Sequence, residues 1–365
     1  MNNKKVLVIS VLTIVLVCFS GCQRYENPLR FMMEHDNNAE NEIAEEQDNN
    51  SSENIQSGGA SNSNNSNSTK TVILGTYGNV NDLIKTEDYS KIANVELAQQ
   101  TIDNKEVSDL ITVSNKVSEI LSDSATSSLI LTCKSANLEE ISYFLYLTVK
   151  NDKPVIVIPE DMRGYSLDTA VRDAVSVAVN NSSANKGTMI LVNRNLYCPR
   201  DFSAEVLTGI KNNKGLMGTL SDNNTDNPIV TYSYSSNKKH NSTSEFDITS
   251  SKDLPYVSIL YDYVGNDGSV YEKLEVLSDG IVLVPSTSDG SLSSGVSSIV
   301  KDSSKSLPVV VTGATVENAV SYDYSGNSFS VITTDLSPVK ARLICSLALT
   351  KTKEVSSVGV YFKEY

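Results

Sequence analysis

Short runs of consecutive apolar residues recur along the chain from Thr71 onward. Continuous apolar runs, as opposed to alternating ones, are typical of strands in a sheet that is buried on both faces. The expected strands are TVILGTY, which we expect to stop at Gly78, and then SSLILTC, KPVIVIP, KGTMILVN, LPYVSILYDYV, SDGIVLVP, SLPVVVTG and SFSVIT.

Apolar residues at helical spacing separate several of these runs. The segment VSDLITVSNKVSEIL places four apolar residues on one face: Leu110, Val113, Val117 and Leu121. Further helices are expected at LEEISYFLYLTV, TAVRDAVSVAV and PVKARLICSLALTKT, the last with Ala341, Ile344, Cys345 and Ala348 on its inner face. Alternating strands and helices predict an α/β fold with a mostly parallel sheet. A polar stretch from Ser221 to Ser251 divides a larger N-terminal domain, 71–250, from a smaller C-terminal domain, 251–365.

One turn between a strand and a helix is a candidate functional site. The run LILTC breaks into KSAN before the helix that is expected to start near Leu138. Ser135 or Asn137 is expected to cap that helix, and Glu139 and Glu140 suit the positive end of its dipole. In α/β proteins, ligands bind at the carboxyl ends of the strands, where such turns lie.

The first 22 residues are typical of a targeting segment. Lys4 and Lys5 precede the apolar run VLVISVLTIVLVCF, which ends in Ser-Gly-Cys. The segment looks like a bacterial lipoprotein signal, with Cys22 lipidated after cleavage. An uncleaved anchor helix is the alternative, although the run is shorter than the ~20 residues that usually span a bilayer. Residues 23–70 are rich in Asn, Ser and Glu and are expected to be a disordered tether. The folded part is therefore expected outside the cytoplasm, attached to the membrane by its lipid.

Charge and residue usage exclude several classes of protein. The formal charge of −14 argues against a nucleic-acid partner. The chain has no Walker A loop, no GxGxxG after a strand and no paired CxxC. His35 and His240 are the only histidines, which argues against a catalytic triad or a multi-histidine metal site. We expect no cofactor and no metal.

The remaining cysteines permit at most one disulfide. Besides Cys22, the chain after the signal contains Cys133, Cys198 and Cys345, and their spacing does not choose a pair. Small buried side chains are the favoured interpretation.

The segments quoted above resemble, in order, those of the bacterial type II L-asparaginases. The family's Thr-Gly-Gly-Thr after the first strand matches GTYGN, and its Thr-His-Gly-Thr-Asp-Thr-Met-Glu-Glu matches TCKSANLEE. The segments SANKGTMILVN, LPYVSILYDY, SDGIVLV, VVVTGAT and DLSPVKARLICSLALTKTK match further stretches of the family. The resemblance covers about Thr71 to Tyr365 and implies an asparaginase-like fold. It also implies hydrolysis of a side-chain amide by two threonines, with an Asp that binds the substrate's amino group and an assisting Lys.

The positions that carry this chemistry are changed in the present chain. Asn79 stands at the nucleophile's position, and Thr76 matches the first, non-nucleophilic threonine. Ser135 replaces the second threonine, Ala136 the adjacent Asp and Ala204 the lysine. The family's substrate-binding Ser-Gln-Asp falls loosely on Asn104-Lys105-Glu106. The Asp-Gly-rich stretch after the family's Ala-Met-Arg-Pro is shortened here, to DMRGYSLDTAVRDA. The ligand-pocket candidates are Thr76, Asn79, Asn104, Lys105 and Ser135.

Three hypotheses follow for function. The leading one is a pseudoenzyme that binds a small ligand or a protein partner, because an amide at position 79 has no hydroxyl to deprotonate. The second is an active amidohydrolase with altered specificity, in which Ser135 acts alone, beside Lys134. The third is a structural or interaction lipoprotein whose pocket has collapsed.

The resemblance also implies a homo-oligomer, either a dimer or a tetramer. In the family, the smaller domain of a neighbouring subunit completes each active site, and the corresponding positions here fall near Gly265-Asn266 and Ser321-Tyr322. Four tyrosines at alternate positions are expected to be packing residues, namely Tyr261, Tyr263, Tyr322 and Tyr324.

Overall fold

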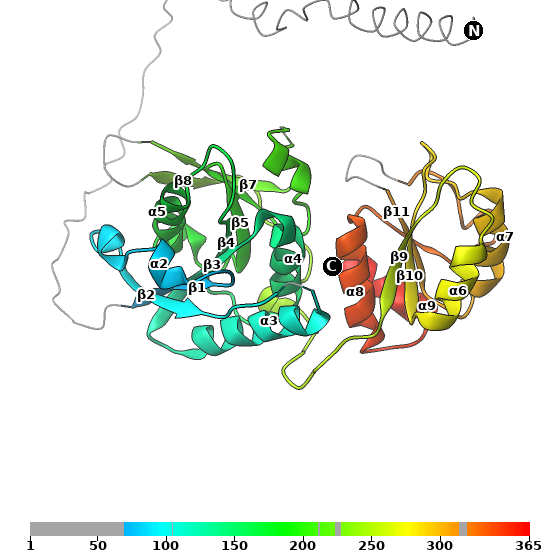
Figure 1. The fold of residues 1–365 in the computed structure, drawn as a ribbon, viewed down its shortest axis with the longest axis horizontal. Helices are drawn as coiled ribbons and strands as arrows, with labels where there is room; N and C mark the ends of the chain where they lie inside the picture. Colours follow the sequence, from blue (N-terminus) through cyan, green and yellow to red (C-terminus); the bar gives the residue numbers. More distant parts are fainter. Residues whose placement is uncertain (1–68, 104, 211, 223–227, 314–319) are drawn as a thin grey trace, which may run out of the picture. The chain divides into compact units, whose positions relative to one another are not determined.

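The computed structural model describes residues 69–103, 105–210, 212–222, 228–313 and 320–365, all of which lie in one compact unit, Asn64–Tyr365. The first of two sheets has eight strands (Figure 1). They are β1 (Lys70–Gly75), β2 (Asn94–Gln99), β3 (Thr126–Cys133), β4 (Val155–Pro159), β5 (Thr188–Val192), β6 (Asn195–Tyr197), β7 (Leu216–Ser221) and β8 (Ile229–Tyr232). Among the described helices, none is both long enough and apolar enough to span a bilayer.

The order of the strands contains a topological switch point between β1 and β3. The order is β2-β1-β3-β4-β5-β6-β7-β8, with parallel pairing from β2 through β5 and antiparallel pairing from β5 through β8. After β1 the chain goes to β2 on one side, and it then returns to β3 on the other side of β1. Such a topological switch point opens a crevice at the carboxyl ends of the two central strands.

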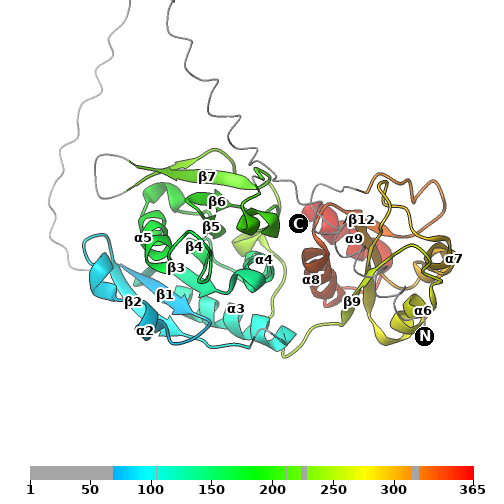
Figure 2. The same cartoon turned by 45° about the horizontal axis from the view of Figure 1, so that its top comes forward.

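Helices cover the first sheet on both faces. They are α2 (Val80–Leu83), α3 (Val107–Ser122), α4 (Leu138–Thr148) and α5 (Leu167–Ala178). Figure 2 shows α4 and α5 on opposite sides of β4 and β5, and both helices contact these strands. Short 3₁₀ helices lie at η2 (Thr86–Tyr89), η3 (Ser135–Asn137), η4 (Asn181–Ser183), η5 (Ala204–Thr208) and η6 (Asn241–Thr243).

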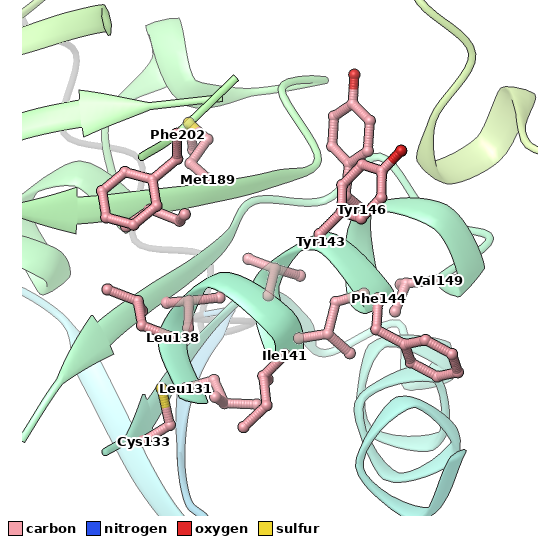
Figure 3. Close-up of a cluster of buried hydrophobic side chains, with 14 of the residues drawn as sticks. Leu131, Cys133, Leu138, Ile141, Tyr143, Phe144, Tyr146, Val149, Met189 and Phe202 are labelled. Atoms are coloured by element: carbon pink, nitrogen blue, oxygen red, sulfur yellow. The ribbon is translucent and has the colours of Figure 1, made fainter. Parts of the chain in front are cut away.

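Helix α4 is buried on all sides, which explains why its sequence is almost continuously apolar. Leu138 and Ile141 lie near Leu131 of β3, whereas Tyr143 and Tyr146 lie on the opposite side of the helix (Figure 3). The helix therefore packs against the first sheet on one side and presents two tyrosines to other elements on the other.

The second sheet is smaller and entirely parallel, in the order β12-β11-β10-β9. Its strands are β9 (Val257–Tyr261), β10 (Gly280–Val284), β11 (Val309–Thr312) and β12 (Ile332–Thr334). Its helices are α6 (Ser269–Leu277), α7 (Ser294–Ser303), α8 (Pro338–Leu349) and α9 (Val355–Glu364). Side chains of alternate residues serve two cores: Ile281 and Leu283 pack with α7, whereas Val282 joins the larger core that contains α4 and α8.

The predicted fold class is confirmed: a larger, mostly parallel sheet is followed by a smaller α/β part. All eight predicted strands and all four predicted helices form, although β1 ends at Gly75 and not at Gly78. The sequence analysis missed β2, β6, β7 and β8. Strands β2, β7 and β8 are only half-buried, so they lack the continuous apolar run that was used as the signal.

The stretch Ser221–Ser251 lies between most of the first sheet and the second, and it also contains β8 and buries Asn241 and Phe246. One expectation about aromatic residues was wrong. Tyr261 and Tyr263 are exposed and do not pack in the core, although Tyr324 does.

A fully buried lysine on α8 joins three segments of the fold. Lys340 Nζ donates to the backbone carbonyl of Arg200 at 2.9 Å and to that of Phe202, and it lies 3.3 Å from a carboxylate oxygen of Glu139. Burial lowers the pKa of Lys340, and the charge of Glu139 counters that effect. Glu139 lies in the first turn of α4, as expected, but it also accepts a hydrogen bond from Ser337. The helix dipole is therefore not the only reason for a carboxylate there.

Arg200 extends the same junction to the end of the chain. Its Nε donates to the carbonyl of Tyr365 at 2.6 Å, and its terminal nitrogens lie 2.7 Å from Asp201 and 2.9 Å from Asp335. Lys214 reaches Asp335 at 3.3 Å. Partial burial raises the pKa of Asp335, but the hydrogen bond and charge of Arg200 outweigh burial and hold that pKa to about 2.

Replacing Asp335 with Asn should make the chain less stable in a pH-dependent way. A carboxyl with a depressed pKa stabilises the fold above its unfolded value of 3.8, and this contribution is lost as pH falls toward about 2. Because the side chain is 44% exposed, solvent screening limits the loss at pH 7 to about 1 kcal/mol. Urea unfolding at pH 7, 4 and 3 measures this difference. Asp302→Asn, in an exposed pair with Lys305, is the control and should cause no measurable change. An Asp335→Asn effect as large at pH 3 as at pH 7 would show that the charge of Asp335 is not responsible.

Candidate functional site

The carboxyl ends of β1 and β3 lie side by side at the switch point. Gly75 pairs in register with Thr132, so residues 76–79 and 134–136 follow two neighbouring strand ends. Thr76 is buried, and its hydroxyl donates to the Thr132 carbonyl at 2.7 Å. This candidate pocket residue therefore fastens the two strand ends to each other.

Asn79 is exposed and acts as a helix cap. Its side-chain oxygen accepts a hydrogen bond from the Asn81 backbone N–H at 3.2 Å, and its amide nitrogen donates to Asp82 at 2.9 Å. Asn is among the residues that helix N-termini prefer, because its side chain replaces a missing backbone acceptor. The side chain at the nucleophile's position is thus engaged in local structure.

The turn after β3 differs from the expected helix cap. Neither Ser135 nor Asn137 caps α4 through its side chain; the 3₁₀ turn η3 precedes the helix. The backbone N–H of Ser135 donates to Asp161 Oδ1 at 2.8 Å, so a carboxylate from the end of β4 satisfies the turn. Ser135 is half-buried and Ala136 is exposed.

An ion pair beside an aromatic ring occupies the same turn. Lys134 Nζ lies 3.5 Å from Glu160 Oε2 and 4.3 Å from the centre of the Tyr77 ring. The other oxygen of Glu160 accepts a hydrogen bond from the Thr132 hydroxyl at 2.7 Å. The Glu160 side chain is only 4% exposed, whereas that of Lys134 is 31% exposed. Thr132 near the end of β3 and residues just after the ends of β1, β3 and β4 therefore meet at this point.

Tyr77, Glu160 and Asp161 were not predicted from the sequence as site residues. A signal was present, because two acidic residues follow the buried run VIVIP directly, where β4 ends beside β3. In the resemblance, Lys134 stands where the family has Gly. Lys134 contacts Glu160, and the backbone of Ser135 contacts Asp161, so the segments after β3 and β4 are joined by charged side chains.

The other expected site residues lie in different places. Lys105 is exposed, 3.3 Å from Asp103, and lines a cavity of about 280 Å³ together with Asn137, Glu140 and Arg342. Ala204 is exposed at the start of η5, and its methyl group offers no functional group. Asn104 and Cys22 lie outside the described residues.

The positions corresponding to the neighbour's contribution are occupied by structural residues. Asn266 is buried and donates to Asp262 Oδ1 at 3.0 Å, and Gly265 adopts a positive φ of 87°. The backbone N–H groups of Ser321 and Tyr322 both donate to the Asp289 carbonyl.

The cysteines and acidic residues of the described part of the chain form neither a reactive thiol site nor a metal-binding cluster. Cys133, Cys198 and Cys345 are free and buried, so no disulfide joins them. Burial raises the pKa of the Cys133 thiol, and nearby Glu160 and Asp161 raise it further, which disfavours the reactive thiolate. Within the described ranges, no three His, Cys, Asp or Glu side chains form a cluster able to hold a metal ion.

Comparisons with known proteins agree with the observed fold. A family model described as "Asparaginase, N-terminal" matches residues 54–210. L-asparaginase 2 of Escherichia coli (strain K12) is 30% identical over 66% of this chain and 71% of its own length. L-asparaginase 2 of Bacillus subtilis (strain 168) is 28% identical over 81% and 80%. A crystal structure described as a probable cytoplasmic L-asparaginase from Campylobacter jejuni is 26% identical, with a TM-score of 0.71, over 81% of this chain and all of the other.

Proposed function

This chain belongs to the asparaginase family, and from that premise we propose that it has lost amidohydrolase activity and acts by binding a small ligand or a protein partner. The contacts of Lys134 carry the proposal. Its side chain lies in the turn that would have to present the second catalytic hydroxyl, and its ammonium contacts Glu160 and Tyr77.

Several groups needed for hydrolysis are replaced at once. Asn79 has no hydroxyl and caps α2 with its side chain, Ala136 lacks a carboxylate, and Ala204 lacks an ammonium group. Removing a single catalytic group commonly costs orders of magnitude in rate, and groups that act as a unit fail together. We therefore infer that the fold has been kept for binding.

Two hydroxyls remain near the turn and define the competing hypothesis of an active amidohydrolase. Ser135 is half-buried at the start of η3, and Thr132 donates to Glu160, a potential base. Thr132 is only 2% exposed, so a substrate would reach its oxygen only after the turn had opened.

The purified full chain should release no ammonia from Asn, Gln or short Asn-containing peptides. Ammonia is measured at micromolar protein with E. coli L-asparaginase 2 as the positive control. Asn79→Thr should also remain inactive, because one restored hydroxyl lacks the carboxylate and the lysine that the family uses. Circular dichroism confirms that each sample is folded.

Ser135→Ala and Thr132→Val are the controls that interpret any activity. Ammonia release by the wild type that either substitution abolishes would refute the pseudoenzyme proposal and identify the rebuilt nucleophile. Release that survives both substitutions would point to a contaminating enzyme.

We also propose that the protein is a lipid-anchored, extracytoplasmic protein. The basic start, the apolar run and the Ser-Gly-Cys sequence ending at Cys22 support this. The wild type expressed in a bacterial host should sediment with membranes, and Cys22→Ala should fail to incorporate radiolabelled palmitate. Equal labelling of both proteins would contradict lipidation at Cys22.

A homo-oligomer is the third part of the proposal. Apolar side chains at and after the end of β9 are open to solvent: Tyr261 is 58% exposed, Tyr263 54% and Val264 95%. Monomers rarely expose adjoining apolar residues in this way, so we infer that a second copy covers them. Light scattering on residues 64–365, which form one compact unit, should give two or four subunit masses. Val264→Asp should lower that mass, because it would bury an unpaired charge. A wild-type mass of one subunit would refute the oligomer.

A further inference from the structure

The group formed by Lys134, Glu160, Tyr77 and Thr132 has the composition of a cation-binding site. A nearly buried carboxylate and the face of an aromatic ring both attract a positive charge. In this chain the cation is the protein's own lysine, which contacts both. The arrangement thus resembles a binding site for an ammonium group, and the ammonium group of Lys134 already occupies it.

The contact between Lys134 and Glu160 is looser than a full charge-assisted hydrogen bond. The nitrogen–oxygen distance is 3.5 Å, whereas such bonds are usually about 2.7–2.9 Å long. Glu160 is held in place independently, because its other oxygen accepts the Thr132 hydroxyl at 2.7 Å. An ammonium group that is not tethered to the backbone of residue 134 has the freedom to approach Oε2 more closely.

Lys134 also has a route out of the site. Its side chain is 31% exposed and carries four rotatable bonds, and the backbone at this position is extended, with φ −69° and ψ 143°. Swinging the lysine into solvent requires no change in the turn, because the backbone of Ser135 is held separately by Asp161. The carboxylate and the ring would then be open to another cation.

We propose that this turn is an ammonium-binding subsite which Lys134 occupies in the free protein and which a ligand with a primary ammonium group takes by displacing it. Primary amines fit because the carboxylate oxygen requires an N–H donor, which a quaternary ammonium lacks. This inference rests on the proposed function, since it describes the ligand class of a site that binds and does not hydrolyse.

The test removes the lysine and supplies its end group from solution. Lys134→Ala in the full chain deletes a fragment equivalent to propylammonium, and Lys134→Gly one equivalent to butylammonium. Both replacements adopt the extended backbone without strain. Binding of each amine to its matching variant is measured by saturation-transfer NMR and by the shift in melting temperature. We expect saturable binding with a Kd on the order of 10 mM, since so small a ligand has little surface to bury.

A double variant that also removes the Glu160 carboxylate decides whether the amine occupies the proposed place. Lys134→Ala combined with Glu160→Gln should lose at least ten-fold in propylammonium affinity, and Tyr77→Leu should lose a few-fold. The wild type should bind propylammonium at least ten-fold more weakly than Lys134→Ala, because its own lysine competes. Lys116→Ala removes a lysine of similar exposure from a pair with Glu119 and should show no gain. Tetramethylammonium is the control for a cation without N–H groups.

Two results would overturn the proposal. One is no saturable binding to either lysine variant at 100 mM amine, in folded protein. The other is equal binding whether residue 160 is Glu or Gln. Neither result depends on ammonia release, so failure of this inference and failure of the pseudoenzyme proposal are separate outcomes.

Discussion

The buried ammonium of Lys340 is a polar constraint that ties together three segments of this fold. A fully buried lysine is tolerated only when acceptors surround it. Here the carbonyls of Arg200 and Phe202 and the carboxylate of Glu139 meet that need. Because these acceptors come from the turn after β6 and from α4, the ammonium of Lys340 holds both segments against α8. Arg200 in turn donates hydrogen bonds to Asp335 and to the backbone oxygen of Tyr365.

The same scaffold positions the candidate site without taking part in it. Parallel pairing of β1, β3 and β4 brings the ends of three strands to one edge, where open α/β sheets usually bind their ligands. In the family this edge carries the catalytic threonines. In this chain Asn79 caps a helix, and Lys134 pairs with Glu160 across the turn. Polar side chains at such an edge can be exchanged at little cost to the core, which explains how the same fold is kept while the residues at these positions differ.

Sequence patterns predicted the buried part of the fold well and its half-exposed part poorly. Strands β1, β3, β4 and β5 are buried on both faces and therefore appear as unbroken apolar runs. Strand β8 alternates over four residues within a polar stretch, too short a pattern to recognise. At the site, the resemblance indicated which residues stand at the family's catalytic positions. The sequence did not predict that Asn79 caps a helix. It also did not predict the Lys134–Glu160 pair, because the two residues are far apart in sequence.

The sequence by itself determined the family, the class of fold, the identity of the apolar faces and which residue types stand at the strand ends. Each of these depends on local periodicity or on residue identity, which the chain states directly. Only the tertiary structure decided what the remaining polar groups contact. Lys134 meets Glu160 because Cys133 pairs in register with Pro159, and Lys340 meets Glu139 because α8 packs on α4. Contacts of this kind follow from strand register and helix packing, which arise from the whole core and not from any single segment.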